Sequence, residues 1–334
     1  MKLKELGEFG LINRIAPQFT RQLPPGTLGI GDDCAVIHQN DRALLITTDL
    51  LVENIHFLRR KISAFELGHK SLAVNLSDIA AMGGVPNAAF LSVAWPKEID
   101  VAWLDEFFAG LAALAEESGT ALLGGDTTGT PGPIIINVAV IGHADPAHLK
   151  LRSAAQAGDV ICVTGYLGDS AGGLQLLLSD LDGAADEDGL ALLRAHHRPR
   201  PHLKEGHWLA QQPGVHAMMD VSDGIDSDVQ RVMEASKVGA RILLNDLPIS
   251  DALRRTAAAN GWNSLELAAA GGEDYCLLCT VDPKAYPKVA ESFAAEFDFP
   301  LTCIGKITHT GKLEYELNGA TIDLKKHGWD HFRS

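Results

Sequence analysis

Carboxylates crowd one short segment of the chain. The stretch "MMDVSDGIDSD", residues 218–228, carries Asp220, Asp223, Asp226 and Asp228 beside Gly224. Four like charges repel one another at this spacing. The segment is therefore either a solvated turn before a helix, where acids favour the positive end of the helix dipole, or a site for a cation. Taken alone it favours the turn, and we expect Asp226 and Asp228 to be acids of the first helical turn.

The same composition recurs at distant places. Strand or helix ends rich in Gly, Asp and Thr or Ser are "GIGDDCA", "TTDLL", "NLSDIAAMGG" and "LGGDTT", and "AGGEDY" adds Glu273 and Asp274. Mg²⁺ takes carboxylate and hydroxyl oxygens as ligands, and glycine lets backbone amides approach a phosphate closely. Several such segments, on loops between rigid elements, predict one shared site for Mg²⁺ and phosphate groups.

Other nucleotide and metal motifs do not fit. The chain has no G-x-x-x-x-G-K-[ST] segment, so it is not a P-loop enzyme. "GIGDDC" lacks the third glycine of the dinucleotide fingerprint and puts two carboxylates where a pyrophosphate would lie. Ile225 and Arg231 stand where an EF-hand starting at Asp220 needs Gly and Glu. Zinc-protease and serine-hydrolase motifs are also absent from the sequence.

The totals describe an acidic chain whose length suits two domains or one large α/β domain. Among 334 residues, 43 are acidic and 28 basic, giving a net charge of −15, which argues against a nucleic-acid partner. Phosphate handling remains compatible with this charge when metal ions supply the positive charge. No apolar run is long enough for a membrane span and the N-terminus does not resemble a signal peptide, so we expect a cytoplasmic, reduced protein. The five scattered cysteines are expected to be buried, and Cys276 and Cys279 to fall on opposite faces of a strand.

Strand and helix signals alternate along both halves, which predicts an α/β fold with α+β layers and two domains. The expected strands lie at 34–38, 43–52, 88–95, 121–125, 134–144, 160–165, 217–222, 240–244, 275–281, 301–307 and 312–317. The expected helices lie at 63–84, 100–119, 169–181, 225–239 and near 283–296, the first opening with Ser63 and Glu66 at capping-box spacing. Residues 186–206 are interpreted as a charged, proline-broken connection, with His196 and His197 on the surface. The domain boundary is placed in a polar segment, giving domains 1–146 and 147–334.

An ordered set of motifs covers almost the whole chain: "GIGDDCAVI", "TTDLLVENIHF", "KSLAVNLSDIAAMGG", "LLGGDTT", "VTGYLGDSAGGL", "DVSDGIDSD", "GGEDYCLL" and "HGWDHF". Together they closely resemble the bacterial thiamine-monophosphate kinase family, whose superfamily includes aminoimidazole ribonucleotide synthetase and selenophosphate synthetase. The resemblance implies transfer of the ATP γ-phosphate onto thiamine monophosphate. It also implies a homodimer in which the N-terminal domains share a β-barrel, an ATP- and Mg²⁺-binding N-terminal domain, and a C-terminal α/β domain that completes the active-site cleft.

Site residues follow from the resemblance position by position. The implied metal ligands are Asp33, Thr47, Thr48, Asp49, Asp78, Asp126, Asp220 and Asp223, of which Asp126 and Asp223 are assigned to catalysis. The implied ATP-binding residues are Phe108, Gly125, Asp126, Arg152 and Ser222. The implied substrate-binding residues are His56, Glu273 and Trp329.

Several of these residues have plainer interpretations. Asp32 is a candidate for supporting Asp33 rather than binding metal, and Arg152 taken alone is a solvated surface charge. Phe108 is a candidate core residue, and Trp329 a plug at the C-terminus.

No general base stands out, and none is needed, because the acceptor phosphate is largely ionised near neutral pH. The alternatives are another ATP-dependent synthetase of the superfamily and a nucleotide- or cation-binding regulator without activity. A selenophosphate synthetase is expected to carry a reactive Cys before the first acidic loop, and this chain has none before Cys34.

Overall fold

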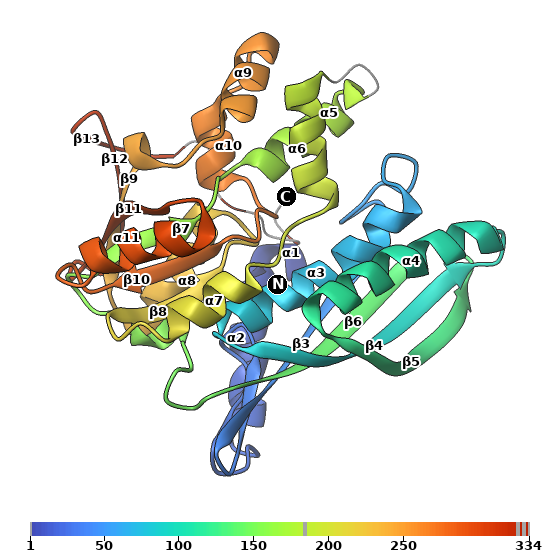
Figure 1. Ribbon diagram of the computed structural model, residues 1–334, viewed down its shortest axis with the longest axis horizontal. Helices are drawn as coiled ribbons and strands as arrows, with labels where there is room; N and C mark the ends of the chain where they lie inside the picture. Colours follow the sequence, from blue (N-terminus) through green and yellow to red (C-terminus); the bar gives the residue numbers. More distant parts are fainter. Residues whose placement is uncertain (1, 183–185, 325–327, 329–331, 333–334) are drawn as a thin grey trace.

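Two β-sheets, one in each half of the chain, organise the molecule (Figure 1). The computed structural model describes residues 2–182, 186–324, 328 and 332. The mixed α/β architecture with two sheets confirms the fold class predicted from the alternating strand and helix signals. Within the described residues, no helix combines the length and the apolar character needed to span a bilayer.

The first sheet has the strand order β1-β2-β3-β6-β4-β5. Its strands are β1 (Thr27–Leu28), β2 (Ala35–Gln39), β3 (Arg42–Val52), β4 (Val85–Pro96), β5 (Ala121–Thr130) and β6 (Ile135–Ala144). Neighbouring strands run antiparallel except for β4 and β5, which are parallel. Alternate residues of β3 and β6 are buried, so the sheet covers a core on one face only.

Helices α3 (Ala64–Ala81) and α4 (Val101–Ser118) cover that face. The predicted capping box at Ser63 and Glu66 is confirmed. The two helices approach closely because Gly68 and Gly110 lie between them: a Cβ atom there would lie 1.9 Å from the Phe107 carbonyl oxygen and 1.8 Å from that of Phe65. This close contact fixes α3 against α4.

The second sheet has the order β13-β12-β9-β11-β7-β10-β8 and carries helices on both faces. Its strands are β7 (Val160–Thr164), β8 (Val215–Asp220), β9 (Gly239–Leu243), β10 (Leu277–Val281), β11 (Leu301–Thr308), β12 (Leu313–Leu317) and β13 (Ala320–Ile322). Its helices are α5 (Asp169–Leu178), α6 (Glu187–His197), α7 (Leu203–Ala210), α8 (Ile225–Ser236), α9 (Asp251–Asn260), α10 (Ser264–Ala270) and α11 (Tyr286–Phe297). Short 3₁₀ turns occupy Arg152–Ala154 and Leu244–Asp246.

Helix α3 lies between the two halves (Figure 1), in contact with β8, α6 and α7 of the second half as well as with its own sheet. It is therefore buried almost all round, including the polar side chains of Lys70, Ser71, Asn75 and Ser77. Polar groups buried in such a position need partners. Of these, Asn75 and Ser77 bond to residues of the site described below, whereas the Ser71 hydroxyl donates to the Leu67 carbonyl of its own helix.

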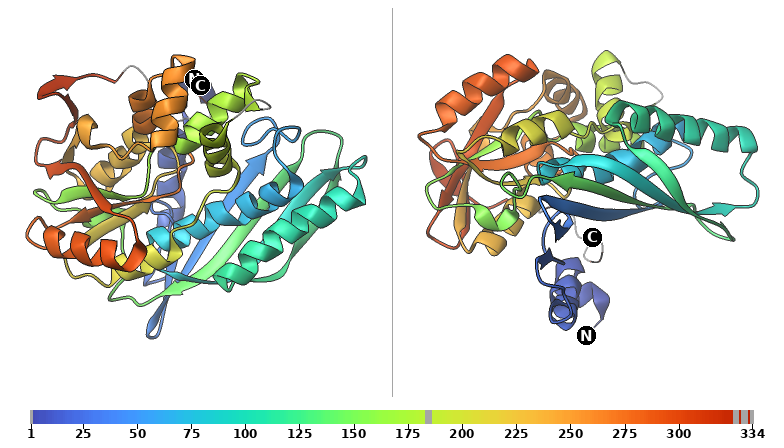
Figure 2. Two further views of the ribbon diagram at one scale, coloured as in Figure 1. Left: turned by 45° about the horizontal axis from the view of Figure 1, so that its top comes forward. Right: turned by 60° about the horizontal axis from the view of Figure 1, so that its bottom comes forward.

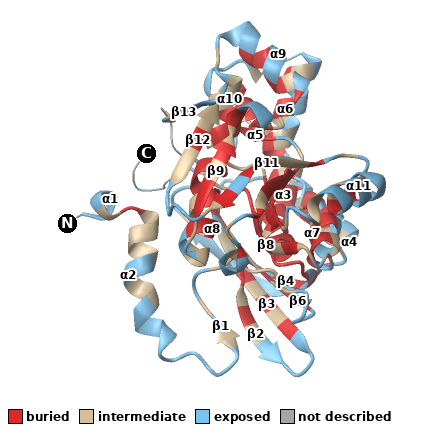
Figure 3. Cartoon of the chain, turned by 90° about the vertical axis from the view of Figure 1, so that its left-hand side faces the viewer, coloured by how far each residue is buried: buried red, intermediate tan, exposed pale blue. Residues whose placement is uncertain are grey.

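The structure differs from the predicted elements at residues 186–206 and at the N-terminus, and it adds α9 and α10, which were also not predicted. Residues 186–206 are not a plain connection: α6 and α7 occupy most of this stretch, with Pro199 and Pro201 between them. At the N-terminus, α1 (Leu3–Leu6) and α2 (Glu8–Thr20), which were not predicted, stand off the main body (Figures 2 and 3). The five cysteines are free and four of them are buried, as predicted, whereas Cys303 is only partly buried.

Candidate metal and phosphate site

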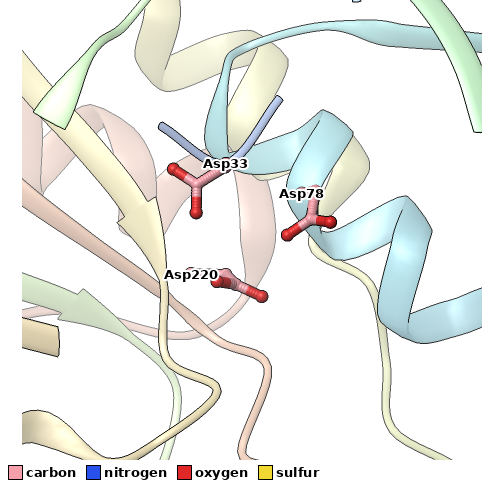
Figure 4. A group of neighbouring side chains, drawn as sticks. All are labelled: Asp33, Asp78 and Asp220. Atoms are coloured by element: carbon pink, nitrogen blue, oxygen red, sulfur yellow. The ribbon is translucent and has the colours of Figure 1, made fainter. Parts of the chain in front are cut away.

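Three carboxylates from distant parts of the chain converge where the two halves meet (Figure 4). Asp33 precedes β2, Asp78 lies in the last turn of α3, and Asp220 ends β8. One oxygen of each lies within 4.8 Å of those of the other two. The structure therefore brings together carboxylates from three of the scattered Asp-containing segments.

Hydroxyl and amide groups hold this cluster in place. The Ser77 hydroxyl donates to Asp220 Oδ2 at 2.7 Å, and the Thr47 hydroxyl donates to Asp78. Asp49 lies beside them, its backbone N–H bound to the Asn75 side chain at 2.9 Å. Ser77 and Asn75 were missed from the sequence, although polar residues inside the apolar spacing of a helix were a usable signal.

Burial and mutual repulsion make this cluster costly without a cation. Burial, reinforced by Asp33, raises the pKa of Asp220 to about 8. Burial, again with Asp33, raises the pKa of Asp49 to about 6. The pKa of Asp78 is raised well above its ordinary value by burial and then by Asp49, Asp220 and Asp33. A divalent cation among these oxygens would offset both the burial and the repulsion.

Arg152 supplies positive charge on one side of the cluster. Its Nε donates to Asp33 Oδ2 at 3.1 Å, Nη2 donates to Asp33 Oδ1, and its backbone N–H reaches Asp32 Oδ2 at 3.2 Å. The side chain is 18% exposed, so the interpretation of Arg152 as a solvated surface charge is wrong. Asp32, whose pKa burial and Asp33 raise to about 7, lies against Arg152 and Asp33, where it can support them.

The other acids of residues 218–228 lie in the loop before α8 and in its first turn. Asp226 and Asp228 occupy the first turn of α8, as predicted, but both are buried rather than solvated. Asp226 accepts hydrogen bonds from the Tyr315 hydroxyl and from the Gly328 backbone at 3.1 Å. Asp228 has one carboxylate oxygen buried without a hydrogen-bond partner. Ser222 and Asp223 lie half-buried in the loop between β8 and α8.

Three of the predicted ATP-binding residues, Gly125, Asp126 and Phe108, lie on other elements of the N-terminal half, β5 and α4. The strand register aligns Leu50 with Asn137, Asn137 with Ser92, and Ser92 with Asp126. Strands lie about 4.8 Å apart, so Asp126 on the edge strand β5 is about 14 Å from β3. Gly125 and Asp126 are exposed on that edge, and Phe108 is 40% exposed on α4 rather than a core residue.

Thr48 faces away from Thr47 and Asp49. It points to the sheet face opposite α3, where its hydroxyl accepts a hydrogen bond from the Asn137 side chain at 2.8 Å. One chain by itself therefore does not bring Gly125, Asp126 and Phe108 to the cluster of Asp33, Asp78 and Asp220.

Of the residues predicted to bind substrate, Glu273 lies at the boundary between the halves. Its Oε2 is 3.0 Å from Lys70 Nζ and 3.2 Å from His196 Nδ1. His196 and His197 are buried, which corrects their expected surface position. The His56 ring accepts a hydrogen bond from the Val52 backbone at 3.0 Å, and Trp329 lies outside the described residues.

Comparisons with known proteins match both halves of the chain. The profile of the AIR synthase related protein N-terminal domain matches residues 31–144, and that of the C-terminal domain matches residues 156–318. The chain is 38% identical over 328 residues to the thiamine-monophosphate kinase of Escherichia coli K12, covering 98% of each protein. It is 34% identical over 334 residues to the enzyme of that name from Bacillus subtilis, covering 98% of this chain and 100% of the relative.

Solved structures give the same result. One described as "AaThiL complexed with AMPPCP and TMP" matches with a TM-score of 0.87 and 32% identity over 99% of both chains. The thiamine monophosphate kinase of Aquifex aeolicus matches with a TM-score of 0.81 and 30% identity, covering 97% of this chain and 100% of that one. The fold and both profiles define a two-domain protein of the AIR synthase related class. Within that class, the chain belongs to the thiamine-monophosphate kinase family of enzymes.

Proposed function

We propose that this protein transfers the γ-phosphoryl group of ATP to thiamine monophosphate, giving thiamine diphosphate and ADP. The observation that carries the proposal is the convergence of Asp33, Asp78 and Asp220 in a chain that matches its relatives over nearly its whole length. The matching structure named with AMPPCP, an analogue of ATP, and with TMP supports both substrates.

The donor set suits Mg²⁺. Carboxylate oxygens converge within 4.8 Å, and the Thr47 hydroxyl lies beside them, which is the hard-oxygen environment that Mg²⁺ prefers. Asp33, Asp49, Asp78, Asp220 and Asp223 would hold the ions. When bound, the ions neutralise phosphate charge and let two polyanions approach one another.

The chain's own groups would then orient the reactants. Arg152, which donates to Asp33 in this structure, and the Ser222 hydroxyl are proposed as donors to phosphate oxygens. Glu273 and His56 are proposed to contact thiamine monophosphate, whose thiazolium cation suits a carboxylate. Because the acceptor is an ionised phosphate, an in-line attack requires no general base, and positioning supplies most of the catalysis.

We further propose that the active form is a homodimer in which Asp126 of the partner subunit, with its Gly125 and Phe108, completes the site. The sheet face opposite α3 and α4 carries exposed apolar side chains, with Leu50 at 50% and Phe90 at 38% exposure, and the edge strand β5 is unpaired on its outer side. Exposed apolar faces and bare edges are suited to pairing with a second copy. Such pairing would bring Asp126 of the partner subunit to the cluster of Asp33, Asp78 and Asp220, from which it is separated within one chain.

The test is ADP release by the purified protein with Mg-ATP, with and without thiamine monophosphate. Thiamine and aminoimidazole-pathway precursors serve as comparison acceptors. Release only with thiamine monophosphate, with thiamine diphosphate as product, supports the proposal. Release with another acceptor transfers the activity to a different member of the superfamily, and tight Mg-ATP binding without any release indicates a regulator.

A further inference from the structure

Lys70 is a buried cation that the chemistry above does not use. It projects from α3 and is among the largest fully buried side chains of the described residues. A buried ammonium group is costly unless it is paired and hydrogen-bonded. Its partners all belong to the second half of the chain, so Lys70 reaches across the boundary between the halves.

Two acceptors hold the ammonium group. Lys70 Nζ donates to Glu273 Oε2 at 3.0 Å and to the backbone carbonyl of His196 at 3.1 Å. His196 lies in the last turn of α6, where carbonyl oxygens lack partners within the helix and the helix dipole favours a cation. Lys70 therefore ties the end of α6 and the Glu273 carboxylate to one point on α3.

Glu273 is held from several directions. Its backbone adopts φ of 64°, and its N–H donates to the Ser222 carbonyl at 2.7 Å. Its side chain is still 23% exposed, whereas that of Lys70 is 1% exposed. The pair thus has a buried cationic end and a partly exposed carboxylate, beside the loop of Ser222 and Asp223.

We propose that Lys70 is a positioning residue for the phosphate acceptor: it fixes the Glu273 carboxylate in the orientation that receives the cationic ring of the substrate. This inference rests on the proposed function. Without the Lys70 ammonium, Glu273 Oε2 loses its shortest ion-pair contact and keeps His196 Nδ1 at 3.2 Å, so the carboxylate is less restricted before the substrate binds. The loss falls on the acceptor and not on Mg-ATP, because Asp33, Asp78 and Asp220 keep their own partners.

The test compares Lys70→Met, Glu273→Gln and the double variant with the wild type. Lys61→Met is the matched control, because Lys61 also pairs across the halves, with Asp180 at 2.8 Å and Asp182 at 2.6 Å, but away from Glu273. Loss of a hydrogen bond to a charged group predicts that Lys70→Met raises the KM and the Kd for thiamine monophosphate by about tenfold or more. The KM for Mg-ATP is expected to change less than about twofold, and Lys61→Met is expected to leave both constants unchanged.

The double variant separates positioning from a purely structural role. If Lys70 acts through Glu273, Lys70→Met adds nothing to the acceptor Kd once Glu273→Gln is present, although each single change weakens binding. This comparison remains available if Lys70→Met alone does not fold, because the double variant leaves no buried charge unpaired.

The opposite outcomes are distinct. An unchanged acceptor Kd in folded Lys70→Met, equal losses for both substrates, or additive losses in the double variant would each overturn the inference. Wild-type protein that does not phosphorylate thiamine monophosphate would instead overturn the proposed function.

Discussion

Asp220 shows how one side chain can make stability depend on metal. Burial and Asp33 raise its pKa to about 8, from an ordinary value of 3.8. Between these values the folded protein retains a proton that the unfolded chain has already lost. The favourable contribution is therefore present at low pH and is lost as pH rises through the folded-state pKa. Asp32, with a pKa raised to about 7, acts in the same direction.

We expect the free energy of unfolding of the metal-free protein to fall between about pH 4 and about pH 8, by at most about 1.4 kcal/mol per pH unit for one group. Mg²⁺ binds the deprotonated carboxylates, so the stabilisation by Mg²⁺ should grow over the same range. Denaturant titrations in EDTA and in Mg²⁺ measure both. Asp220→Asn should reduce the fall of the free energy of unfolding with pH. Asp105→Asn, at an exposed position on α4, should leave it unchanged. A slope unaffected by Asp220→Asn would contradict this account of the cluster.

At the scale of elements, strand β5 depends on one glycine. Gly125 has φ of 150°, and a Cβ atom there would lie 1.7 Å from the Leu91 carbonyl oxygen of β4. Gly125→Ala should therefore lower the free energy of unfolding by about 2 kcal/mol or more and displace neighbouring Asp126. Gly129→Ala is the matched control on the same strand, where the nearest atom is 4.0 Å away. Equal stability of the two variants in urea would show that β5 tolerates the shift.

The elements also show what the sequence could predict. The Asp-containing segments were visible because ligand type and helix or strand ends are local properties. The burial of Lys70, His196 and Asp228 was not visible, because it arises only when α3 packs against the second half. Pro199 and Pro201 were taken to break the chain into a connection, yet they merely separate α6 from α7. The strand order, which places Asp126 far from β3, is likewise a tertiary property.

For the whole molecule, the strand order makes the dimer part of the chemistry. Asp220 lies at the boundary between the halves, whereas Asp126 lies on the edge strand β5, three strands away from β3. If Asp126 of the partner subunit completes the site, Asp126→Ala and Asp220→Asn should each abolish turnover as homodimers. A heterodimer of the two variants contains one site with both changes and one site with neither. Random exchange of subunits makes about half of the dimers mixed, so about one quarter of wild-type activity should return.

The measurement is ADP release after subunit exchange, with the two variants carrying different tags so that mixed dimers are isolated and counted. Purified mixed dimers should then show about half of wild-type activity, since one of two sites is intact. Two Asp126→Ala subunits with different tags, exchanged in the same way, control for recovery caused by exchange alone. Inactive mixed dimers would contradict the proposal that Asp126 of the partner subunit completes the site.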